Sequence, residues 1–307
     1  MEKVKKIVLI GASGFVGSAL LNEALNRGFE VTAVVRHPEK IKIENENLKV
    51  VKADVSALDE VAAVCKGADA VISAFNPGWN NPDIYDETIK VYLTIIDGVK
   101  KAGVNRFLMV GGAGSLFIAP GLRLMDSGEV PENILPGVKA LGEFYLNFLK
   151  KEKEIDWVFF SPAADMRPGV RTGRYRLGKD DMIVDIVGNS HISVEDYAAA
   201  MIDELEHPQR RACLHAARGP DRPRDHSRAV SAREQAAVGA RLRVRRRRES
   251  EHDAARARRA RASGADPDAA HGRPHRDRGS GAHRPGKAAA GAGRHRRILA
   301  GAGAARL

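Results

Sequence analysis

The sequence predicts an α/β protein in which a doubly wound parallel sheet carries helices on both faces. Short apolar runs rich in β-branched residues alternate with longer amphipathic segments, which is typical of parallel strands joined by crossover helices. A glycine-rich turn, GASGFVG at residues 11–17, separates the first apolar run from the first amphipathic segment. The composition then changes after Pro208, so we assign this fold to residues 1–208.

Each element follows from its pattern and its flanking residues. The expected strands are residues 7–10, 31–35, 48–52, 70–74, 106–110 and 157–161, and the expected helices are residues 16–27, 58–66, 84–102 and 138–152. A further short strand is expected at residues 182–186. It lies in a segment near residues 162–190, rich in Gly, Pro and Arg, which we expect to cap the substrate site.

A last helix is expected after Ser193, because Ser193 and Asp196 have the spacing of a capping box. In that motif the hydroxyl accepts a free amide at the helix end and the carboxylate reaches back. We favour this capping role of Asp196 over a catalytic one.

Residues 209–307 differ in kind from the rest of the chain. They contain no Phe, Tyr, Trp, Met or Asn, and they hold 26 Lys and Arg against 9 Asp and Glu, a net charge of +17. The other 208 residues carry −6, so the net +11 of the whole chain does not indicate a nucleic-acid-binding fold.

Such a tail is expected to be disordered, because it cannot bury enough apolar surface to offset its chain entropy. One interpretation is an arginine-rich arm that binds nucleic acid nonspecifically. We favour a reading-frame shift or a fusion near Gln209, since Ala, Arg, Gly and Pro have GC-rich codons. On that interpretation the sheet lacks its last edge strand, which would lower its stability.

Several classes of protein are disfavoured by simple counts. Cys65 and Cys213 are isolated from each other and from histidines at metal spacing, so neither a disulfide framework nor a metal site is expected. No apolar run reaches the roughly 18 residues of a membrane span, and the apolar run that begins at Ile7 is too short for a signal peptide. We expect a cytoplasmic enzyme, either monomer or homodimer, that acts on a small molecule.

The glycine turn is the strongest functional signal. Gly11 permits a tight turn, Gly14 allows close approach of a diphosphate, and Gly17 allows the helix to pack on the sheet. The intervening Ala12, Ser13, Phe15 and Val16 complete the loop at the helix N-terminus, whose free amides favour an anion. The motif therefore predicts a Rossmann-type nicotinamide dinucleotide site, and a turn without a ligand is the less favoured alternative.

Residues 1–208 resemble the atypical and extended short-chain dehydrogenase/reductase superfamily. The glycine spacing supports this, and so do RFLMVGGAGSL, DWVFFSPA, RPGVRTGRYRLG and ISVEDYAAAMIDELE, which look like the NADH-flavin reductase group, often labelled NAD-dependent epimerase/dehydratase. This resemblance implies that Asp54 and Val55 flank the adenine. It also implies that Ala74, Phe75 and Asn76 lie beside the ribose and the nicotinamide, and that Pro162 contributes to the cofactor pocket.

The residues after the second strand bear on the choice of cofactor. Val35, Arg36 and His37 offer no carboxylate for the ribose hydroxyls, whereas the cation of Arg36 suits a 2′-phosphate. We favour NADP(H) over NAD(H). The alternatives are that Arg36 stacks near adenine or points to solvent, and that Asp54 caps the following helix.

The catalytic dyad of the superfamily is incomplete. Lys139 matches the family lysine, which also binds the nicotinamide ribose, but Leu135 occupies the position of the family tyrosine. Leucine cannot transfer a proton, and we expect Tyr145 to be a packing residue. Ser115 lies near the family's catalytic serine, and we leave open whether it contacts substrate or structures its loop.

The resemblance also implies a substrate pocket. Trp79 is expected to stack on a planar acceptor or to close a loop, and Arg171 and Arg174 are expected to pair with a phosphate such as that of FMN or to remain solvated. Because a reduced flavin anion needs no positioned acid, we expect hydride transfer from NAD(P)H to a flavin (FMN or FAD) or a quinone-like acceptor. The alternatives are a sugar epimerase/dehydratase and a redox sensor without catalysis.

Overall fold

The computed structural model describes residues 5–207 and 212–218. Its main sheet has eight strands in the order β10-β12-β8-β5-β4-β1-β2-β3, and all neighbours run parallel except β10, which is antiparallel to β12. In chain order they are β1 (Lys6–Ile10), β2 (Glu30–Val35), β3 (Leu48–Lys52), β4 (Ala70–Ser73), β5 (Arg106–Val110), β8 (Asp156–Ser161), β10 (Tyr175–Gly178) and β12 (Ala212–Arg218). The predicted doubly wound sheet is confirmed.

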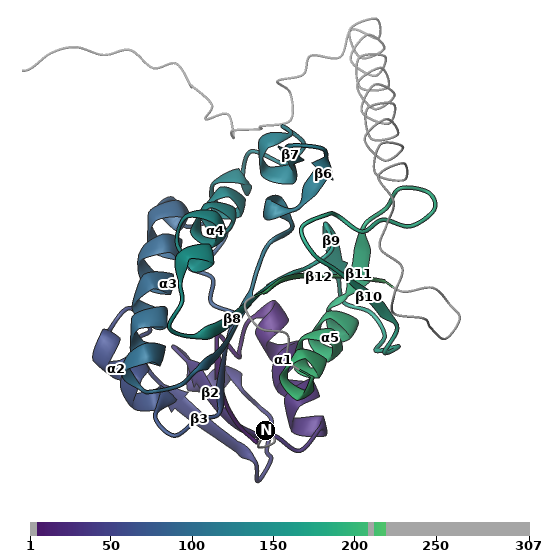
Figure 1. The fold of residues 1–307 in the computed structure, drawn as a ribbon. Helices are drawn as coiled ribbons and strands as arrows, with labels where there is room; N and C mark the ends of the chain where they lie inside the picture. Colours follow the sequence, from purple (N-terminus) through teal and green to yellow (C-terminus); the bar gives the residue numbers. More distant parts are fainter. Residues whose placement is uncertain (1–4, 208–211, 219–307) are drawn as a thin grey trace, which may run out of the picture. The chain divides into compact units, whose positions relative to one another are not determined.

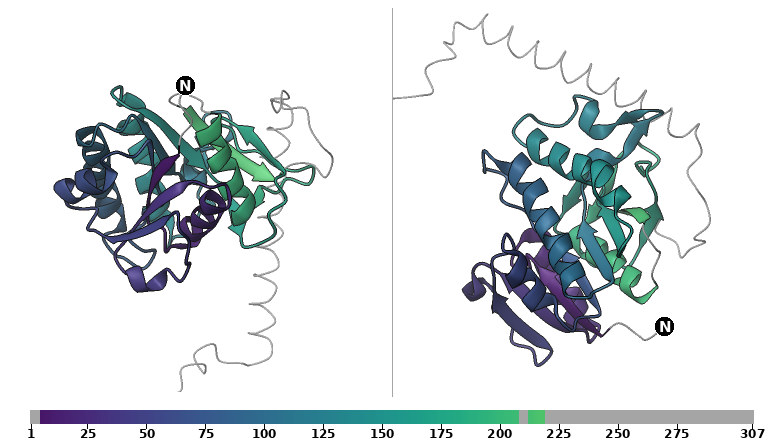
Figure 2. Two further views of the ribbon diagram at one scale, coloured as in Figure 1. Left: turned by 90° about the horizontal axis from the view of Figure 1, so that it is seen from below. Right: turned by 60° about the vertical axis from the view of Figure 1, so that its left-hand side comes forward.

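Helices cover both faces of this sheet (Figures 1 and 2). Within the described residues the α-helices are α1 (Phe15–Asn26), α2 (Leu58–Cys65), α3 (Ile84–Lys101), α4 (Leu135–Asn147) and α5 (Val194–Glu206). Alternate side chains of β1 face opposite layers, as the two-residue period of a strand requires. Ile7 and Leu9 pack with α1 and α5, whereas Val8 and Ile10 pack with α2, α3 and α4.

Helix α4 begins three residues before the predicted position. Pro136 lies in its first turn, where a proline is tolerated because the first amides of a helix have no intrahelical acceptor. The helix ends at Asn147, and a short 3-10 turn, Leu149–Lys151, follows it. The predicted packing role of Tyr145 is confirmed, since its buried ring stacks on Phe159 with the centroids 4.7 Å apart.

The predicted strand at residues 182–186 is wrong. This segment is irregular and is followed by a turn in which the Asp185 carboxylate accepts the amides of Val187 and Asn189. Regular structure lies on either side of it, because β9 (Asp165–Arg167) pairs with β11 (His191–Ser193), and β10 joins the main sheet. The apolar run reflects burial of Met182 and Ile183, not a strand.

The expectation that the sheet lacks its last strand is also wrong. Strand β12 pairs in parallel with β8, in a register that places Ala212 opposite Val158 and His215 opposite Ser161. Backbone pairing depends little on side-chain identity, and the small residues Ala216 and Ala217 pack in the core. The predictions of disorder and nucleic-acid binding for the remainder of the tail concern residues outside the described part of the chain.

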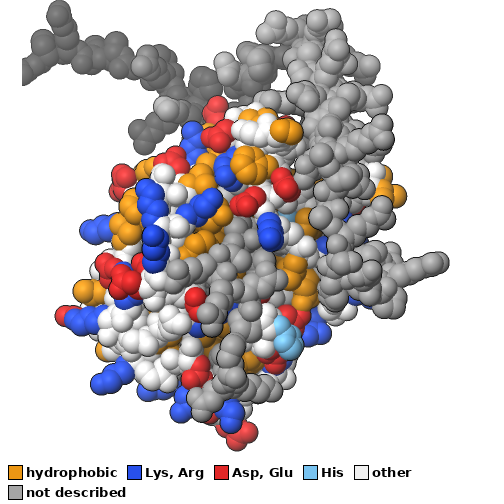
Figure 3. Space-filling view, viewed as in Figure 1, with side chains coloured by type: hydrophobic (Ala, Val, Ile, Leu, Met, Phe, Trp, Pro, Cys, Tyr) orange, Lys and Arg blue, Asp and Glu red, His pale blue; other side chains and the backbone are white. Residues whose placement is uncertain are grey.

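Charge is not segregated on the one face of the described part that Figure 3 shows. On the face shown in Figure 3, basic and acidic side chains are intermixed. None of the helices in the described ranges is both long enough and apolar enough to cross a membrane.

Candidate functional site

The turn between β1 and α1 is built so tightly that only glycine fits at two positions. Gly11 has a φ of +80°, and a Cβ atom on it would lie 2.7 Å from the Ala74 carbonyl oxygen. A Cβ on Gly17 would lie 2.0 Å from the carbonyl oxygen of Gly11. The Gly11 amide donates to Val34 (3.0 Å) and the Gly14 amide to Gly11 (3.0 Å), which fixes the turn against β2.

The N-terminus of α1 is open to an anion. Its cap is Gly14, no side chain caps it, and its first turn holds no acidic residue. Ala12, Ser13, Phe15 and Val16 lie around this end, with the Phe15 side chain half exposed. A dinucleotide diphosphate fits this arrangement, because the glycines let the backbone of the turn pack closely against the helix and the positive end of the helix dipole is not neutralised.

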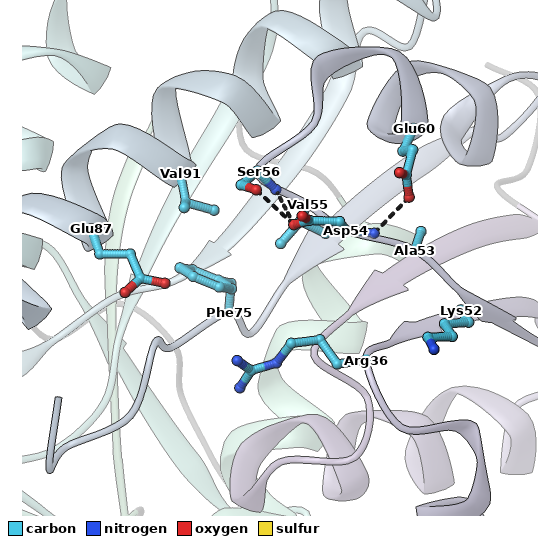
Figure 4. Close-up of a pocket in the computed structure, with 10 residues that line it drawn as sticks. All are labelled: Arg36, Lys52, Ala53, Asp54, Val55, Ser56, Glu60, Phe75, Glu87 and Val91. Atoms are coloured by element: carbon cyan, nitrogen blue, oxygen red, sulfur yellow. Dashed lines mark hydrogen bonds between the residues drawn. The ribbon is translucent and has the colours of Figure 1, made fainter. Parts of the chain in front are cut away.

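A cavity of about 620 Å³ lies at the carboxyl ends of β2, β3 and β4 (Figure 4). It is lined by Arg36, Lys52, Ala53, Asp54, Val55, Ser56, Glu60, Phe75, Glu87 and Val91. In an open parallel sheet this edge is where ligands bind. The structure therefore brings together Arg36, Asp54 and Val55, expected at the adenosine, and Phe75, expected beside the ribose and the nicotinamide.

Asp54 structures the loop after β3. Its carboxylate accepts the amide (2.9 Å) and the hydroxyl (2.7 Å) of Ser56, and these bonds hold the pKa of Asp54 below its ordinary value, with a smaller contribution from the charge of Arg36. Asp54 does not cap α2, whose N-cap is Ala57. The Asp54 amide in turn donates to Glu60 (2.7 Å), so the loop is rigid before any ligand arrives.

The loop after β4 is also fixed by polar contacts. Asn76 accepts the Gly78 amide (2.7 Å), and the phenol of Tyr92 donates to the Phe75 carbonyl (3.0 Å). Trp79, at the end of this loop, is 48% exposed. A Cβ on Gly137 would lie 2.9 Å from its ring, so Trp79 packs on the first turns of α4.

Lys139 lies on α4, two residues beyond this contact. Its ammonium makes no ion pair with another described residue, which leaves it available for a ribose hydroxyl. Leu135 begins the helix at the position of the missing phenol. One turn after Lys139, Glu143 accepts a hydrogen bond from the phenol of Tyr85 on α3.

Ser115 is 1% exposed, and its hydroxyl donates to the Gly112 carbonyl (3.3 Å). The loop-structuring hydrogen bond is therefore present, while the substrate contact of Ser115 stays a prediction. Pro162 is buried and directly follows β8, at the same edge of the sheet.

The predicted substrate arginines occupy a loop held by α1 and α5. Arg171 makes two hydrogen bonds to the buried Glu23 of α1 (2.6 and 2.7 Å), so its guanidinium already has a carboxylate partner. Arg174 lies in the same exposed loop. Their roles toward a phosphate stay predictions.

One of the two hydrogen bonds of the predicted capping box at α5 is present. Ser193 accepts the Asp196 amide (3.1 Å), which confirms the cap. The Asp196 carboxylate does not reach back, however, since it accepts the amides of Thr172 and Gly173 and the Thr172 hydroxyl at 2.6–2.7 Å. The amides of Thr172 and Gly173, more than twenty residues earlier in the chain, donate to this carboxylate because they would otherwise be unpaired.

Three site features were missed by sequence reasoning: the Glu23–Arg171 pair, the Tyr85–Glu143 hydrogen bond, and Arg123 beside Ser115. Each joins residues distant in sequence or in a short loop, where no periodic pattern signals a contact. The four-residue spacing of Glu143 from Lys139 points to an ion pair between them, but within the described residues Glu143 accepts the phenol of Tyr85 instead.

Comparisons with known proteins agree with this geometry. Residues 11–208 match the family model described as NAD(P)H-binding. The uncharacterized protein YwnB of Bacillus subtilis is 43% identical over 207 residues, which cover 66% of this chain and 93% of that protein.

Two solved structures are similar to this chain in both fold and sequence. A proposed epimerase from Bacteroides thetaiotaomicron is 87% identical with a TM-score of 0.68, and the match covers 72% of this chain and 100% of that one. A proposed NADH-flavin reductase from Streptococcus pneumoniae is 32% identical with a TM-score of 0.59, covering 70% and 99%. The predicted family is confirmed: the chain belongs to the NAD(P)H-binding family of atypical short-chain dehydrogenases/reductases.

Proposed function

We propose that this chain is an NAD(P)H-dependent oxidoreductase that reduces a flavin or a quinone-like acceptor. The observation that carries the proposal is Leu135, an apolar residue at the phenol position, one turn before Lys139. Reduction of a simple carbonyl develops an alkoxide that needs a positioned acid, whereas a flavin or quinone delocalises the charge. The relative from Streptococcus pneumoniae, a proposed NADH-flavin reductase, supports the same chemistry.

The residues of the chain would bind and orient the two partners. The glycine turn and α1 would hold the diphosphate, Arg36 would pair with a 2′-phosphate, and Lys139 would hydrogen-bond the nicotinamide ribose. When bound, the reduced nicotinamide supplies the hydride. Trp79, which packs on α4 at Gly137, offers a half-exposed ring on which a planar acceptor can stack.

The proposed preference for NADP(H) follows from the position of Arg36 at the adenosine cavity. Arg36 lines it, and no carboxylate occupies residues 35–37. We expect Arg36→Ala to raise the Kd of NADPH about tenfold and to leave that of NADH nearly unchanged, because only NADPH has the 2′-phosphate. Similar losses for both cofactors in isothermal calorimetry would contradict this assignment.

The experiment that tests the reaction uses the purified chain with NADPH or NADH under anaerobic conditions. FMN, FAD, riboflavin and menadione are added separately, and the absorbance of the reduced nicotinamide is followed. Oxidation that depends on enzyme and acceptor supports the proposal. Tight cofactor binding without turnover of any acceptor supports a redox sensor instead, and conversion of a nucleotide sugar without net oxidation supports an epimerase.

A further inference from the structure

Beyond the predicted site, a small hairpin follows β5. It consists of β6 (Phe117–Ala119) and β7 (Leu122–Arg123), and it lies next to α4 (Figure 1). The segment that leads into it contains Ser115 and emerges from the carboxyl end of β5, the edge at which open α/β sheets bind ligands. The hairpin is thus a candidate wall of the acceptor site.

The hairpin is anchored from two sides. The Phe117 amide donates to the Asp180 carbonyl (2.8 Å), and the Met182 amide donates to the Phe117 carbonyl (2.9 Å). On the other side, a Cβ on Gly114 would lie 2.3 Å from a Val138 methyl group, so the preceding turn is in close contact with α4. A side chain on this hairpin therefore starts from a rigid base.

Arg123, the last residue of the hairpin, is held in one orientation by two contacts. Its guanidinium lies 4.0 Å above the centroid of the Phe117 ring, and Nη1 donates to the carbonyl of Ser115. Stacking fixes the plane of the group and the hydrogen bond fixes its rotation. Because a guanidinium has five N–H donors, most of them remain for another acceptor.

Within the described residues, the Arg123 guanidinium has no acidic partner. Among the described residues, no carboxylate lies within 4.0 Å of Arg123, whereas Arg106 pairs with Glu204 and Arg171 with Glu23. The carboxylate of Asp180, whose backbone contacts the hairpin, accepts the phenol of Tyr145 (3.2 Å) instead. An oriented cation without a counter-charge at a ligand-binding edge favours an anionic group on the ligand.

We propose that Arg123 binds the anionic group of the acceptor, such as the phosphate of FMN. This inference rests on the proposed function and narrows its substrate class to planar acceptors that bear a phosphate or a carboxylate. It also assigns to Arg123 the role expected of Arg171, whose guanidinium is bound to Glu23. Fork-like pairing of a guanidinium with phosphate oxygens explains why an arginine serves here.

The test compares two flavins that differ only in the phosphate. The full chain, saturated with NADP⁺, is titrated with FMN and with riboflavin, and the Kd of each is measured from the quenching of flavin fluorescence. We expect FMN to bind at least tenfold more tightly than riboflavin, and Arg123→Gln to abolish that difference by weakening FMN alone. Arg123→Lys should restore part of the preference, because it keeps the charge but not the fork.

Arg167→Gln is the matched control, since Arg167 is an exposed arginine paired with Asp165 and its replacement changes the net charge equally. It should leave both dissociation constants unchanged. Equal affinity of the unmodified chain for the two flavins would overturn the role of Arg123 while leaving flavin reduction intact. An equal loss for both flavins in Arg123→Gln would also overturn it, because damage to the hairpin does not distinguish them. Binding of neither flavin would overturn the role of Arg123 together with the flavin part of the proposed function, and would leave a quinone-like acceptor.

Discussion

At the scale of single residues, Gly17 decides whether α1 can approach the turn. We expect Gly17→Ala to destabilise the fold by roughly 1–3 kcal/mol, the usual cost of overpacking, and to weaken NADPH binding at least tenfold. The reason is that the new Cβ would lie 2.0 Å from the Gly11 carbonyl oxygen, so the helix must move from the diphosphate site. Urea unfolding and calorimetry measure the two effects.

Gly112→Ala provides the control for that variant. Its Cβ would lie 3.5 Å from a Leu141 methyl group, an ordinary contact, and its φ of −139° suits alanine. The free energy of unfolding should therefore change by less than about 1 kcal/mol. If the two variants behave alike, the close approach at Gly17 does not position α1.

Tyr85 gives a second prediction, because its phenol donates to Glu143 and this hydrogen bond raises the pKa of Tyr85 above its ordinary value of 10.0. In Glu143→Gln the negative charge is lost, so we expect the pKa of Tyr85 to fall. Ultraviolet difference titration of tyrosinate measures the change, and Tyr85→Phe identifies which part of the curve belongs to Tyr85. A curve unchanged by Glu143→Gln would show that the pair does not form.

The residues of the site were predictable to different degrees for a physical reason. Gly11, Gly14 and Gly17 act within one turn, so their spacing in sequence reports their geometry directly. Arg171 and Glu23 are 148 positions apart, and nothing local in either segment indicates that they meet. Ser115 was predicted only because it lies near a serine position of the family. The structure shows that its hydroxyl donates to a carbonyl of its own turn.

At the scale of elements, an ionic cluster around the buried Glu23 joins α1, α5 and the loop before β10. Glu23 accepts hydrogen bonds from Arg171 and Arg27, and Arg27 also pairs with Asp203 and Glu206. Burial by itself raises the pKa of Glu23, but the hydrogen bonds and charges of the two arginines outweigh it and hold that pKa below 4.5. The cluster thus connects α1, which we propose holds the diphosphate, to the segment that we expect to cap the site.

Because the folded-state pKa of Glu23 is depressed, its contribution to stability is complete above the unfolded value of 4.5 and is lost as the pH falls through the folded value. We expect Glu23→Gln to lower the free energy of unfolding by roughly 2–3 kcal/mol at about pH 7. The difference from the unmodified chain should shrink as the pH drops below 4.5. Urea unfolding at several pH values measures this.

The control for the pH series is Glu30→Gln, since Glu30 is exposed and lies 3.8 Å from Lys6. An exposed pair of this kind contributes at most about 1 kcal/mol, so this variant should unfold nearly as the unmodified chain does. A penalty for Glu23→Gln that stayed constant down to low pH would contradict the assigned direction of the shift.

Asp196 anchors the loop before β10 through three hydrogen bonds from Thr172 and Gly173. We expect Asp196→Ala to cost roughly 1–3 kcal/mol, because the loop loses three hydrogen bonds to a buried carboxylate. Trypsin should then cleave faster after Arg171 and Arg174. Asp185→Ala loosens a different turn and should not accelerate these cleavages, so similar fragments from both variants would refute the anchor.

The elements show why pattern reading succeeds in the sheet and fails beside it. Strands such as residues 106–110 are buried on both faces, so hydrophobicity identifies them. The segment from 162 to 190 is held by backbone pairing and by buried carboxylates such as Asp196, and these leave no periodicity in the sequence. Met182 and Ile183 were read as a strand because they are apolar, although they pack as an irregular segment.

At the scale of the whole molecule, β12 is the last strand of the described part of the chain. It lies between β8 and β10, so it supplies hydrogen-bonding partners to both. The composition of the chain changes at Gln209, before this strand, which is why sequence analysis assigned residues 212–218 to the tail. The change in composition therefore does not mark the end of the sheet, because strand pairing depends on the backbone.

Two truncated chains test the importance of β12. A chain ending at Arg218 keeps this strand and every residue of the proposed site, so we expect its Kd for NADPH to equal that of the full chain. A chain ending at Pro208 exposes the edge of β8 and leaves β10 without its partner, so it should unfold at lower urea concentration and tend to aggregate. Calorimetry measures the Kd, urea unfolding measures the stability, and light scattering detects aggregation. Equal stability of the two truncated chains would mean that β12 contributes nothing to the stability of the sheet. Weaker NADPH binding by the chain ending at Arg218 than by the full chain would mean that residues 219–307 take part in holding the cofactor.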